Sequence, residues 1–315
     1  MWTWMVSGPQ SALDPGGPHA SSIATLSWIM FAGGGVIFLI VMLLLGWALV
    51  VPGRRSAWLS NIYVVVVGGI AFPIVTLSAL LIYGLSIART ITAMPGEAPL
   101  EISVVGEQFW WRVHYLENGK PAFETANDIH IPVGQPVRLS LTTADVIHSF
   151  WVPSLAGKLD MIPGQTNVLT LKPDRLGVYR GQCAEFCGGA HALMAFDVVA
   201  LAQDQFDAWR NGQSRAAREP TDPFLRRGKK LFLAAGCGSC HTVRGTSADG
   251  TIGPDLTHVG SRRSIAAGTL PNNRGTLGGW ISGSQHLKPG NKMPPFDMLS
   301  GQDLLAVTSY LESLK

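Results

Sequence analysis

The sequence predicts a multidomain membrane protein that combines a two-helix transmembrane hairpin, a β-sandwich or barrel and an all-α domain. Two long runs near the N-terminus carry no charged residue, the middle of the chain alternates in short runs divided by turn residues, and the last part returns to helical periodicity. Only 14% of the 315 residues are charged and 47% are hydrophobic, a balance too apolar for an ordinary soluble protein. The net charge of +3 gives no support to a nucleic-acid partner.

The transmembrane hairpin is expected over residues 23–90. Its two charge-free runs, about 23–51 and about 59–88, are each long enough to span a ~30 Å hydrocarbon core as a helix. Pro73 lies in the second run, where a membrane helix tolerates it because neighbouring groups satisfy the freed carbonyl. Two buried core helices are the alternative interpretation, but the length of the runs and their lack of charge argue against it.

The topology of the hairpin follows from its basic residues. Arg54 and Arg55 lie between the two runs and no Lys or Arg precedes them, so the positive-inside rule puts this connection in the cytoplasm. Residues 1–22 have neither the basic start nor the continuous apolar run of a signal peptide, and we interpret them as an extracytoplasmic N-terminal segment. Everything after the hairpin then also lies outside.

Residues 91–202 are typical of a small β domain. Short runs rich in Val, Ile, Trp, Phe and Thr are separated by the turn sequences Asn-Gly and Pro-Val-Gly-Gln-Pro, which favours a sandwich or barrel. The polar stretch 203–222 is expected to be a linker. Residues 223–315 begin with a basic helical pattern, continue through Gly/Pro-rich loops and end in an apolar-periodic helix, which predicts a compact, mainly α-helical domain.

A turn-rich segment near the end of the β domain carries the ligand types of a soft-metal site. Cys183 and Cys187 are four positions apart, His191 follows after four more and Met194 after another three. Thiolates, an imidazole and a thioether together suit copper that is used for electron transfer. A second histidine is needed to complete such a site, and His148, at the end of a β run upstream, is the candidate.

The spacing of the two cysteines leaves alternatives open. Both thiolates could bridge two copper ions, which would share an electron over two metals with little ligand movement. A Cys2His2 zinc site is one alternative, and a disulfide with an incidental histidine is the other. Zinc sites usually show closely paired cysteines but have no use for Met194, so copper is favoured.

The C-terminal domain carries a second motif, Cys237-Gly238-Ser239-Cys240-His241, which is the C-x-x-C-H signature of covalent haem c attachment. The two cysteines would form thioethers to the haem vinyl groups, and the histidine would bind the iron. A redox-active C-x-x-C pair is the alternative, which the adjacent His241 and the lack of a βαβ context weaken.

The second axial ligand of the haem should lie downstream of this motif. Met293 and Met298 compete for the position, and a methionine would raise the haem potential, which suits donation to copper. His258 and His286 are weaker options. The domain resembles class I cytochromes c, in which Gly-Pro-Asp-Leu (253–256) and a Met-Pro pair recur. This resemblance favours Met293 as the ligand and assigns Met298 to core packing.

The copper-ligand segment resembles subunit II of haem–copper cytochrome c oxidases. The matching stretches are residues 145–167 and 179–199, and every position of the family pattern C-x-E-x-C-x3-H-x2-M is present. The resemblance implies a dinuclear CuA centre in a cupredoxin-like β-sandwich or barrel behind two transmembrane helices, here followed by an all-α cytochrome c domain.

The resemblance also implies a set of ligand roles. Two cysteines bridge the coppers, two histidines bind one copper each, and a thioether and a backbone carbonyl complete the coordination: Cys183 and Cys187, His148 and His191, Met194 and Glu185. The side chain of Glu185 would face a Mg²⁺ or Mn²⁺ site at the contact with subunit I.

Two stretches depart from the family pattern. The aromatic motif usually begins Gln-Trp, whereas this chain has Phe109 after Gln108. The first aromatic is associated with electrons arriving from soluble cytochrome c, so we expect the fused haem domain to be the immediate donor, at the high effective concentration that a tether gives. The stretch Ala57–Ile62 also lacks the acidic residue that many members carry before the second membrane helix.

These observations lead to the hypothesis of a subunit II of a bacterial caa3-type oxidase in the plasma membrane, with both termini and both redox domains on the outer face. Electrons would pass from an external donor, a soluble or membrane cytochrome c or a bc1 complex, to haem c, then to CuA and then to haem a in subunit I. Subunit I, with haem a, haem a3 and CuB, would reduce O2 to water and pump protons, and subunit III would be a further partner. This chain has no histidine between Ala20 and Val113, so its membrane helices hold no O2-reducing site.

Two rival functions remain at this point. One is a CuA and haem c electron-transfer subunit of another haem–copper superfamily reductase, of the nitric oxide reductase type. The other is a non-enzymatic metal-binding assembly module, which predicts zinc or a single copper.

Overall fold

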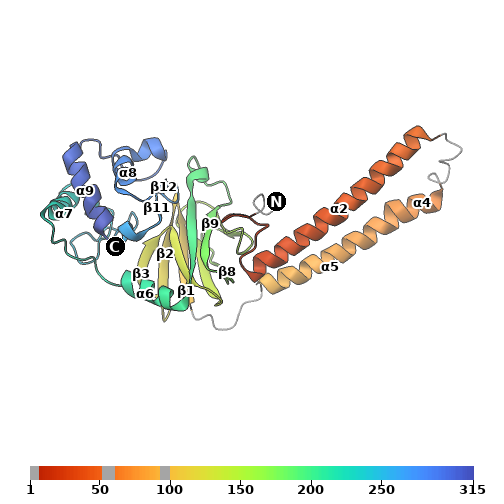
Figure 1. Ribbon diagram of the computed structural model, residues 1–315, viewed down its shortest axis with the longest axis horizontal. Coiled ribbons are helices and arrows are strands. Elements are labelled where there is room, and N and C mark those ends of the chain that lie inside the picture. Colours follow the sequence, from red (N-terminus) through yellow and green to blue (C-terminus); the bar gives the residue numbers. More distant parts are fainter. Residues whose placement is uncertain (1–6, 52–60, 93–99) are drawn as a thin grey trace. The chain divides into compact units, whose positions relative to one another are not determined.

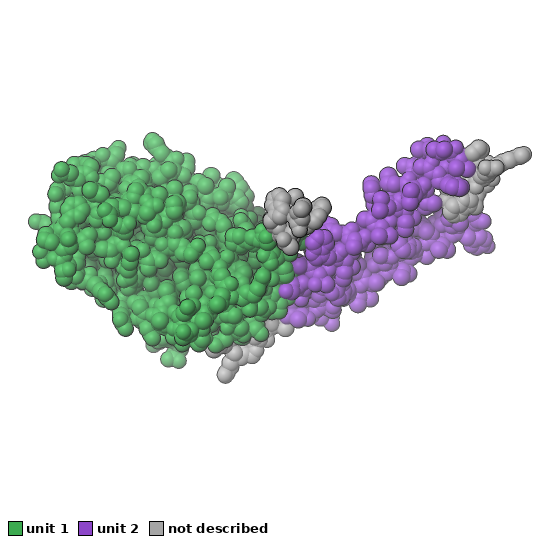
Figure 2. All heavy atoms as spheres, viewed as in Figure 1, with its two compact units in different colours: residues 1–20, 95–315 green, residues 21–94 purple. Residues whose placement is uncertain are grey.

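The computed structural model describes three parts of the chain, residues 7–51, 61–92 and 100–315 (Figure 1). Arg54, Arg55 and most of the acid-free stretch Ala57–Ile62 lie outside the described residues. The chain divides into two compact units, residues 1–20 with 95–315 and residues 21–94 (Figure 2). The structure confirms the predicted fold class, with two apolar helices, a β-sandwich and a helical C-terminal domain.

The first apolar helix, α2, extends from Pro18 to Val50. Its 33 residues make it about 50 Å long, more than the hydrocarbon core of a bilayer requires. It begins at Pro18 rather than near residue 23, because proline is favoured in the first turn of a helix and the short polar residues that follow continue it.

The second apolar helix is interrupted once by a wider turn. α4 (Ile62–Val66) and α5 (Phe72–Thr92) are joined by the π-helical turn η2 (Val67–Ala71). This turn lies directly before Pro73, which has no N–H to donate and whose ring would clash with a carbonyl of the preceding turn. Both apolar helices are long enough to cross a membrane.

The β domain consists of two packed five-stranded sheets, with strand orders β3-β2-β1-β5-β8 and β4-β10-β9-β6-β7. The strand bounds are β1 Leu100–Glu107, β2 Trp110–Glu117, β3 Lys120–Ala126, β4 Asp128–Pro132, β5 Val137–Thr143, β6 His148–Trp151, β7 Leu159–Met161, β8 Asn167–Leu171, β9 Gly177–Cys183 and β10 Ala195–Leu201. Most pairs are antiparallel, but β1 pairs with β5 and β10 pairs with β4 in parallel. Alternate residues of β1 and β5 are buried between the sheets, as the alternating sequence pattern predicts.

The centre of the sandwich is an aromatic cluster beneath the predicted copper ligands. Trp111 is fully buried, and its ring lies 5.8 Å from that of Phe150 and 5.0 Å from that of Phe196. Phe150 and Phe196 stack on each other at 4.5 Å. The same tryptophan ring lies 6.2 Å from the imidazole of His148, so the core directly supports one of the predicted ligands.

The N-terminal segment packs on the β domain before α2 begins. The backbone N–H of Arg180 donates to the carbonyl of Pro9 at 2.8 Å, and the N–H of Gly16 donates to that of Ser154 at 2.7 Å. A Cβ at Gly17 would lie 2.5 Å from the carbonyl oxygen of Lys172, so this close approach requires glycine. The segment is therefore held by turns and bonds, rather than being simply extended.

The expected linker 203–222 is partly wrong, because its first half is a helix. α6 (Gln203–Gln213) buries Phe206, and Trp209 packs on the rings of Tyr115 and Phe123. These two aromatic residues are three positions apart and so share one helix face. The overall polarity of the segment obscured this short apolar stripe.

The C-terminal domain packs three helices around one core: α7 Pro223–Ala234, α8 Arg274–Leu287 and α9 Gly301–Ser313. Asp222 caps the first and Ser300 caps the last, each accepting backbone N–H groups of the first turn. A Cβ at Gly228 would lie 2.1 Å from the carbonyl oxygen of Ala306, so this glycine allows α7 and α9 to touch. A small hairpin, β11 (Ser264–Ile265) with β12 (Leu270–Pro271), is an addition that the helical prediction missed.

Candidate metal and haem sites

The predicted copper ligands come from three neighbouring elements at one end of the sandwich. His148 begins β6, Cys183 ends the adjacent strand β9, and Cys187 lies in the loop that follows. His191 begins the short 3-10 helix η3 (His191–Leu193), and Met194 joins it to β10. Because β6 pairs with β9, the folding of this sheet brings the distant His148 beside the cysteines.

The donor atoms of these side chains converge on one another. Sγ of Cys183 lies 3.8 Å from Sγ of Cys187 and 3.8 Å from Nδ1 of His148. Sγ of Cys187 lies 3.6 Å from Nδ1 of His191 and 3.9 Å from Sδ of Met194. Each cysteine therefore has one histidine beside it, and the thioether lies on the side of the second cysteine.

A backbone carbonyl extends this donor set. The carbonyl oxygen of Glu185 lies 3.2 Å from Sγ of Cys183, whereas the Glu185 side chain is exposed. Two sulfurs, two imidazole nitrogens, a thioether and a carbonyl exceed the four ligands of a tetrahedral zinc ion. The donors fit a pair of soft metal ions bridged by the two thiolates better than they fit one zinc.

The charge state of the two thiols also favours a bound cation. The side-chain hydrogen bonds with Cys187 and with His148 lower the pKa of Cys183, although burial opposes this. The same neighbour, once ionised, raises the pKa of Cys187, and burial raises it further. The pair therefore loses one proton readily, and the second thiolate requires a cation beside it.

The site lies just beneath the surface of the loop. His148, Cys183, Cys187 and Met194 are all buried, with at most 4% of each side chain exposed. Phe186, between the two cysteines, is 76% exposed. The loop thus shields the donor atoms from water and presents an exposed apolar side chain, whose ring lies 5.8 Å from that of His191.

In the C-terminal domain, residues of the haem motif line a cavity of about 270 Å³. Cys237 and Cys240 line it as free thiols, together with His241. Nδ1 of His241 lies 2.8 Å from the carbonyl oxygen of Pro254, which can only accept, so Nδ1 carries the proton and Nε2 is free to bind iron. A Cβ at Gly253 would lie 2.5 Å from the same ring, so the Gly-Pro pair fixes the imidazole.

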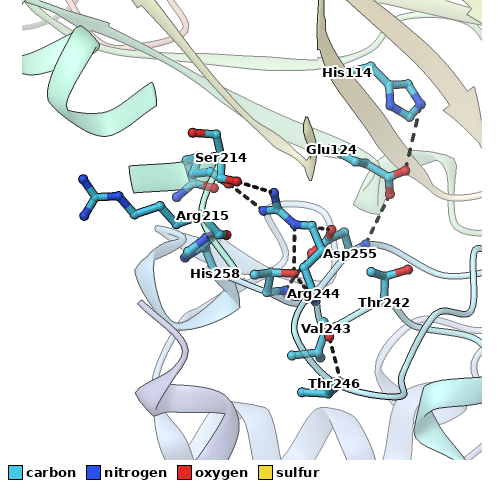
Figure 3. Close-up of polar contacts among 12 residues, drawn as sticks. His114, Glu124, Ser214, Arg215, Thr242, Val243, Arg244, Thr246, Asp255 and His258 are labelled. Carbon is cyan, nitrogen blue, oxygen red and sulfur yellow. Dashed lines mark hydrogen bonds and ion pairs between the residues drawn. The ribbon is translucent and has the colours of Figure 1, made fainter. Parts of the chain in front are cut away.

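The cavity also separates the candidates for the second axial ligand. Met293 lines it, and the carbonyl of Met293 accepts from Oγ of Ser284 at 2.7 Å. Met298 is 75% exposed and is not part of the lining. Nε2 of His258 donates to the carbonyl of Arg215 at 3.0 Å (Figure 3), and His258 is not part of the cavity lining.

Most of the remaining cavity wall is apolar, which suits a porphyrin. Helices α7, α8 and α9 contribute apolar side chains to it, namely Phe232, Leu277, Ile281, Val307 and Leu311. Free thiols, an oriented imidazole and a thioether within an apolar lining are the donor set of a covalently attached haem.

Comparison with known proteins decides the family. A family model described as "Cytochrome C oxidase subunit II, periplasmic domain" matches residues 109–201, and one described as "Cytochrome c" matches residues 225–315. Cytochrome c oxidase subunit 2 of Alkalihalophilus pseudofirmus is 38% identical over 320 residues, covering 97% of this chain and 91% of the relative. The chain belongs to the cytochrome c oxidase subunit 2 family.

A second relative and one solved structure are also similar to parts of the chain. Cytochrome c oxidase subunit 2 of Bacillus sp. (strain PS3) is 36% identical over 225 residues, covering 68% of this chain and 62% of the relative. The crystal structure of the periplasmic domain of subunit II of cytochrome oxidase (CoxB) of Bradyrhizobium japonicum is 32% identical, covers 38% of this chain and 96% of that chain, and has a TM-score of 0.36.

As a cytochrome c oxidase subunit 2, the protein is part of an electron-transport enzyme. Its cytochrome c domain implies haem c, and its subunit II domain implies copper. The resemblance expected from the ligand pattern is confirmed at the level of the family.

In this subunit 2 chain, the haem cavity is closed in part by the copper domain. Gln108 and Phe109, from the turn between β1 and β2, and Trp110, the first residue of β2, line the same cavity as Cys240 and Met293. The two redox domains therefore share a wall, and nothing in the spacing of either motif indicates this arrangement.

Polar contacts bind the two redox domains along this boundary. The N–H of Asp255 donates to Oε1 of Glu124 at 3.2 Å, and Glu124 also lies 3.9 Å from His114 (Figure 3). Nη2 of Arg112 donates to the carbonyl of Thr251 at 2.8 Å. The two bonds that cross the boundary could not be predicted from the sequence, because the residues that each one joins are more than a hundred positions apart and the copper-domain partners belong to no motif.

Proposed function

We propose that the chain is the electron-accepting subunit of a caa3-type haem–copper oxidase. It takes electrons from an external donor, passes them from its own haem domain to its copper domain, and delivers them to haem a of subunit I. The observation that carries this proposal is the shared wall, in which Phe109 and Trp110 of the copper domain close the cavity that holds Cys240 and His241. Two redox domains so joined suit electron transfer within one chain.

Several residues of the cavity would hold haem c, each in a different way. Cys237 and Cys240 would form the thioethers, and His241, through Nε2, and Met293, through its thioether, would hold the iron. When bound, haem c and CuA would each carry one electron, and their ligands would set their reduction potentials. The apolar lining excludes water, and Pro254 holds the tautomer of His241.

The copper donors would act as a preorganised cage. In this proposal the thiolates of Cys183 and Cys187, the imidazoles of His148 and His191, the thioether of Met194 and the carbonyl of Glu185 would hold the copper, which would supply a one-electron carrier. Burial of the donors limits their movement, which keeps the reorganisation on electron transfer small.

The remaining partners lie outside this chain. The exposed carboxylate of Glu185 is free to contribute to a Mg²⁺ or Mn²⁺ site shared with subunit I. The sequence between Ala20 and Val113 has no histidine, so O2 reduction and proton pumping belong to subunit I, with subunit III as a further partner. The donor would be a soluble or membrane cytochrome c or a bc1 complex.

The topology proposal places the redox domains and both termini on the outer face of a bacterial plasma membrane. Residues 7–17 bond to the β domain through Pro9 and Gly16, which supports a common side for the N-terminal segment and the copper domain. Two apolar helices return the chain to the side from which it started.

Metal analysis and electron paramagnetic resonance (EPR) of the purified oxidase test this proposal. We expect two coppers per haem c and a two-copper hyperfine pattern, which Cys187→Ser abolishes while the haem c spectrum persists. The reciprocal control, Cys237→Ser, should impair covalent haem attachment and leave the copper signal. Zinc or a single copper per chain would contradict the assignment, and a co-purifying large subunit that reduces nitric oxide but not O2 would indicate the reductase alternative.

A further inference from the structure

Lys288 lies between the two redox sites. It caps the C-terminal end of α8, is 2% exposed and lines the haem cavity. Its ammonium donates to three carbonyl oxygens, those of Phe109 at 2.6 Å, Leu193 at 2.8 Å and Ala266 at 2.9 Å. The first two acceptors belong to the copper domain and the third to the haem domain, so one side chain joins both.

A lysine this deeply buried is costly unless its donors are satisfied. Burial lowers the pKa of Lys288 to about 7. Its three N–H groups match the three carbonyl acceptors, a geometry that favours the ammonium and orients it. Such an arrangement defines one relative position of the three backbone segments, because moving any of them leaves a buried donor unpaired.

The two copper-domain acceptors adjoin the copper donors. Leu193 directly precedes Met194, and its carbonyl also accepts from Oγ of Thr269 at 3.2 Å. Phe109 follows Gln108, whose amide donates to the carbonyl of Cys187 at 2.5 Å. Both acceptors are therefore one residue away from a copper donor or from a group bonded to one.

The other end of Lys288 connects to the haem side. Its backbone N–H donates to the carbonyl of Ser284 at 2.9 Å. Oγ of Ser284 in turn donates to the carbonyl of Met293 at 2.7 Å. A continuous series of covalent and hydrogen bonds thus leads from Met293, through Ser284 and Lys288, to the peptide that precedes Met194.

We propose that Lys288 is a positioning residue for electron transfer between the haem and copper domains: it lines the haem cavity, its ammonium holds the carbonyls of Phe109 and Leu193 in the copper domain, and it so sets the separation of the two sites. The inference rests on the proposed relay of electrons from haem c to copper. Because electron tunnelling falls exponentially with separation, a side chain that fixes this distance controls the rate without touching either metal.

The test uses the full-length oxidase with Lys288→Met, which preserves length and apolar packing but removes the three donors. Haem c is reduced rapidly under anaerobic conditions, and electron arrival at copper is followed in a single turnover. Loss of a hydrogen bond to a charged group changes an equilibrium constant by about a factor of ten, here that of the joined arrangement of the two domains. We therefore expect electron transfer to slow at least about tenfold, while the copper EPR signal and the haem spectrum persist.

A second readout does not depend on electron transfer. The N–H of Ala195 donates to the carbonyl of Ala267 at 3.0 Å across the same boundary, so its amide exchange should accelerate in Lys288→Met. Arg180→Gln is the matched control, because Arg180 donates a single peripheral bond to the carbonyl of Gly268 at 3.0 Å. It should leave the single-turnover rate unchanged.

The outcomes separate this inference from the proposed function. Absence of haem-to-copper transfer in the unmodified oxidase overturns both. Normal transfer in the unmodified protein and an equal rate in Lys288→Met overturns only the role of Lys288. If Lys288→Met fails to assemble, Lys288→Gln, which keeps two donors on a shorter side chain, should assemble and show an intermediate rate, and an unchanged rate there would likewise refute the proposal.

Discussion

Oδ1 of Asp145 lies 2.8 Å from Nε2 of His148, which turns the other ring nitrogen, Nδ1, toward Sγ of Cys183 at 3.8 Å. A carboxylate behind a ligating histidine fixes both the tautomer and the ring orientation. Burial opposes ionisation of Asp145, but the bonds from His148 and from the N–H of Gln108 hold its pKa below the ordinary value. The orientation of His148, the most deeply buried of the proposed copper donors, thus depends on a residue outside the ligand motif.

Replacing this carboxylate should weaken the copper site. Asp145→Asn keeps the side-chain volume but removes the charge, and loss of such a partner typically costs 10–100-fold in metal affinity, so we expect about that reduction. Copper content and EPR at limiting copper measure it. Asp160→Asn is a control on the next strand, since Asp160 bonds to Ser149 and Lys158 rather than to a ligand. Equal copper affinity in both variants would contradict the role of Asp145.

The two candidate methionines should behave differently. Met293→Leu should abolish the charge-transfer band of methionine-ligated iron and lower the haem midpoint potential, because Met293 lines the cavity and its thioether would be lost. Met298→Leu should leave both unchanged, because Met298 is 75% exposed. Absorbance spectroscopy and redox titration distinguish them, and a normal band in Met293→Leu would refute this ligand.

Asp128 and His130 predict opposite pH effects on stability. Burial raises the pKa of Asp128 to about 6, so its folded form keeps a proton that the unfolded chain releases, and its contribution is lost as pH rises from about 4 to about 6. Burial lowers the pKa of His130 to about 4, so its contribution is lost as pH falls from about 6.5 to about 4. In the unmodified protein the two opposite changes of stability with pH largely cancel between about pH 4 and about pH 6.

Asp128→Asn should leave only the pH dependence of stability that comes from His130. The variant should gain stability relative to the unmodified protein as pH rises from about 4 to about 6, by up to about 3 kcal/mol. Thermal unfolding at several pH values measures the gain. Parallel pH profiles for the two proteins would show that Asp128 ionises normally in the folded state.

The contact between α7 and α9 predicts a sharp difference between two glycines. Gly228→Ala should destabilise the haem domain by about 1–3 kcal/mol, because the Cβ of the new alanine would overlap the carbonyl of Ala306. Gly279→Ala should be neutral or stabilising by up to about 1 kcal/mol, since nothing lies within 4 Å of a Cβ on this α8 residue. Calorimetry of the haem-domain transition compares them, and equal transition temperatures would contradict the close packing.

The parts of the fold that the sequence predicted are those with local signals. The apolar runs, the alternating strands and the two ligand motifs each lie within a short window, and the residues of each motif come together in the structure. The helix over Gln203–Gln213 was missed because only Phe206 and Trp209 mark its buried face within a polar stretch.

Long-range relationships could not be predicted in this way. Lys288 looks like an ordinary basic residue after a helix, and only the packing of two domains places Phe109 and Leu193 around its ammonium. Asp145 is one of many acidic residues near a strand until its distance to His148 is known. Such positions depend on contacts between segments that no spacing rule connects.

The most direct test of the central claim is a single-turnover experiment on the oxidised, full-length enzyme. An anaerobic pulse of a one-electron reductant is followed by haem c absorbance and by freeze-quench EPR of the copper site. We predict that haem c is reduced first and is then reoxidised with the same rate constant as that for reduction of the two-copper signal. Copper reduction that precedes haem c reduction, or that proceeds equally fast in Cys237→Ser, would contradict a relay through this chain.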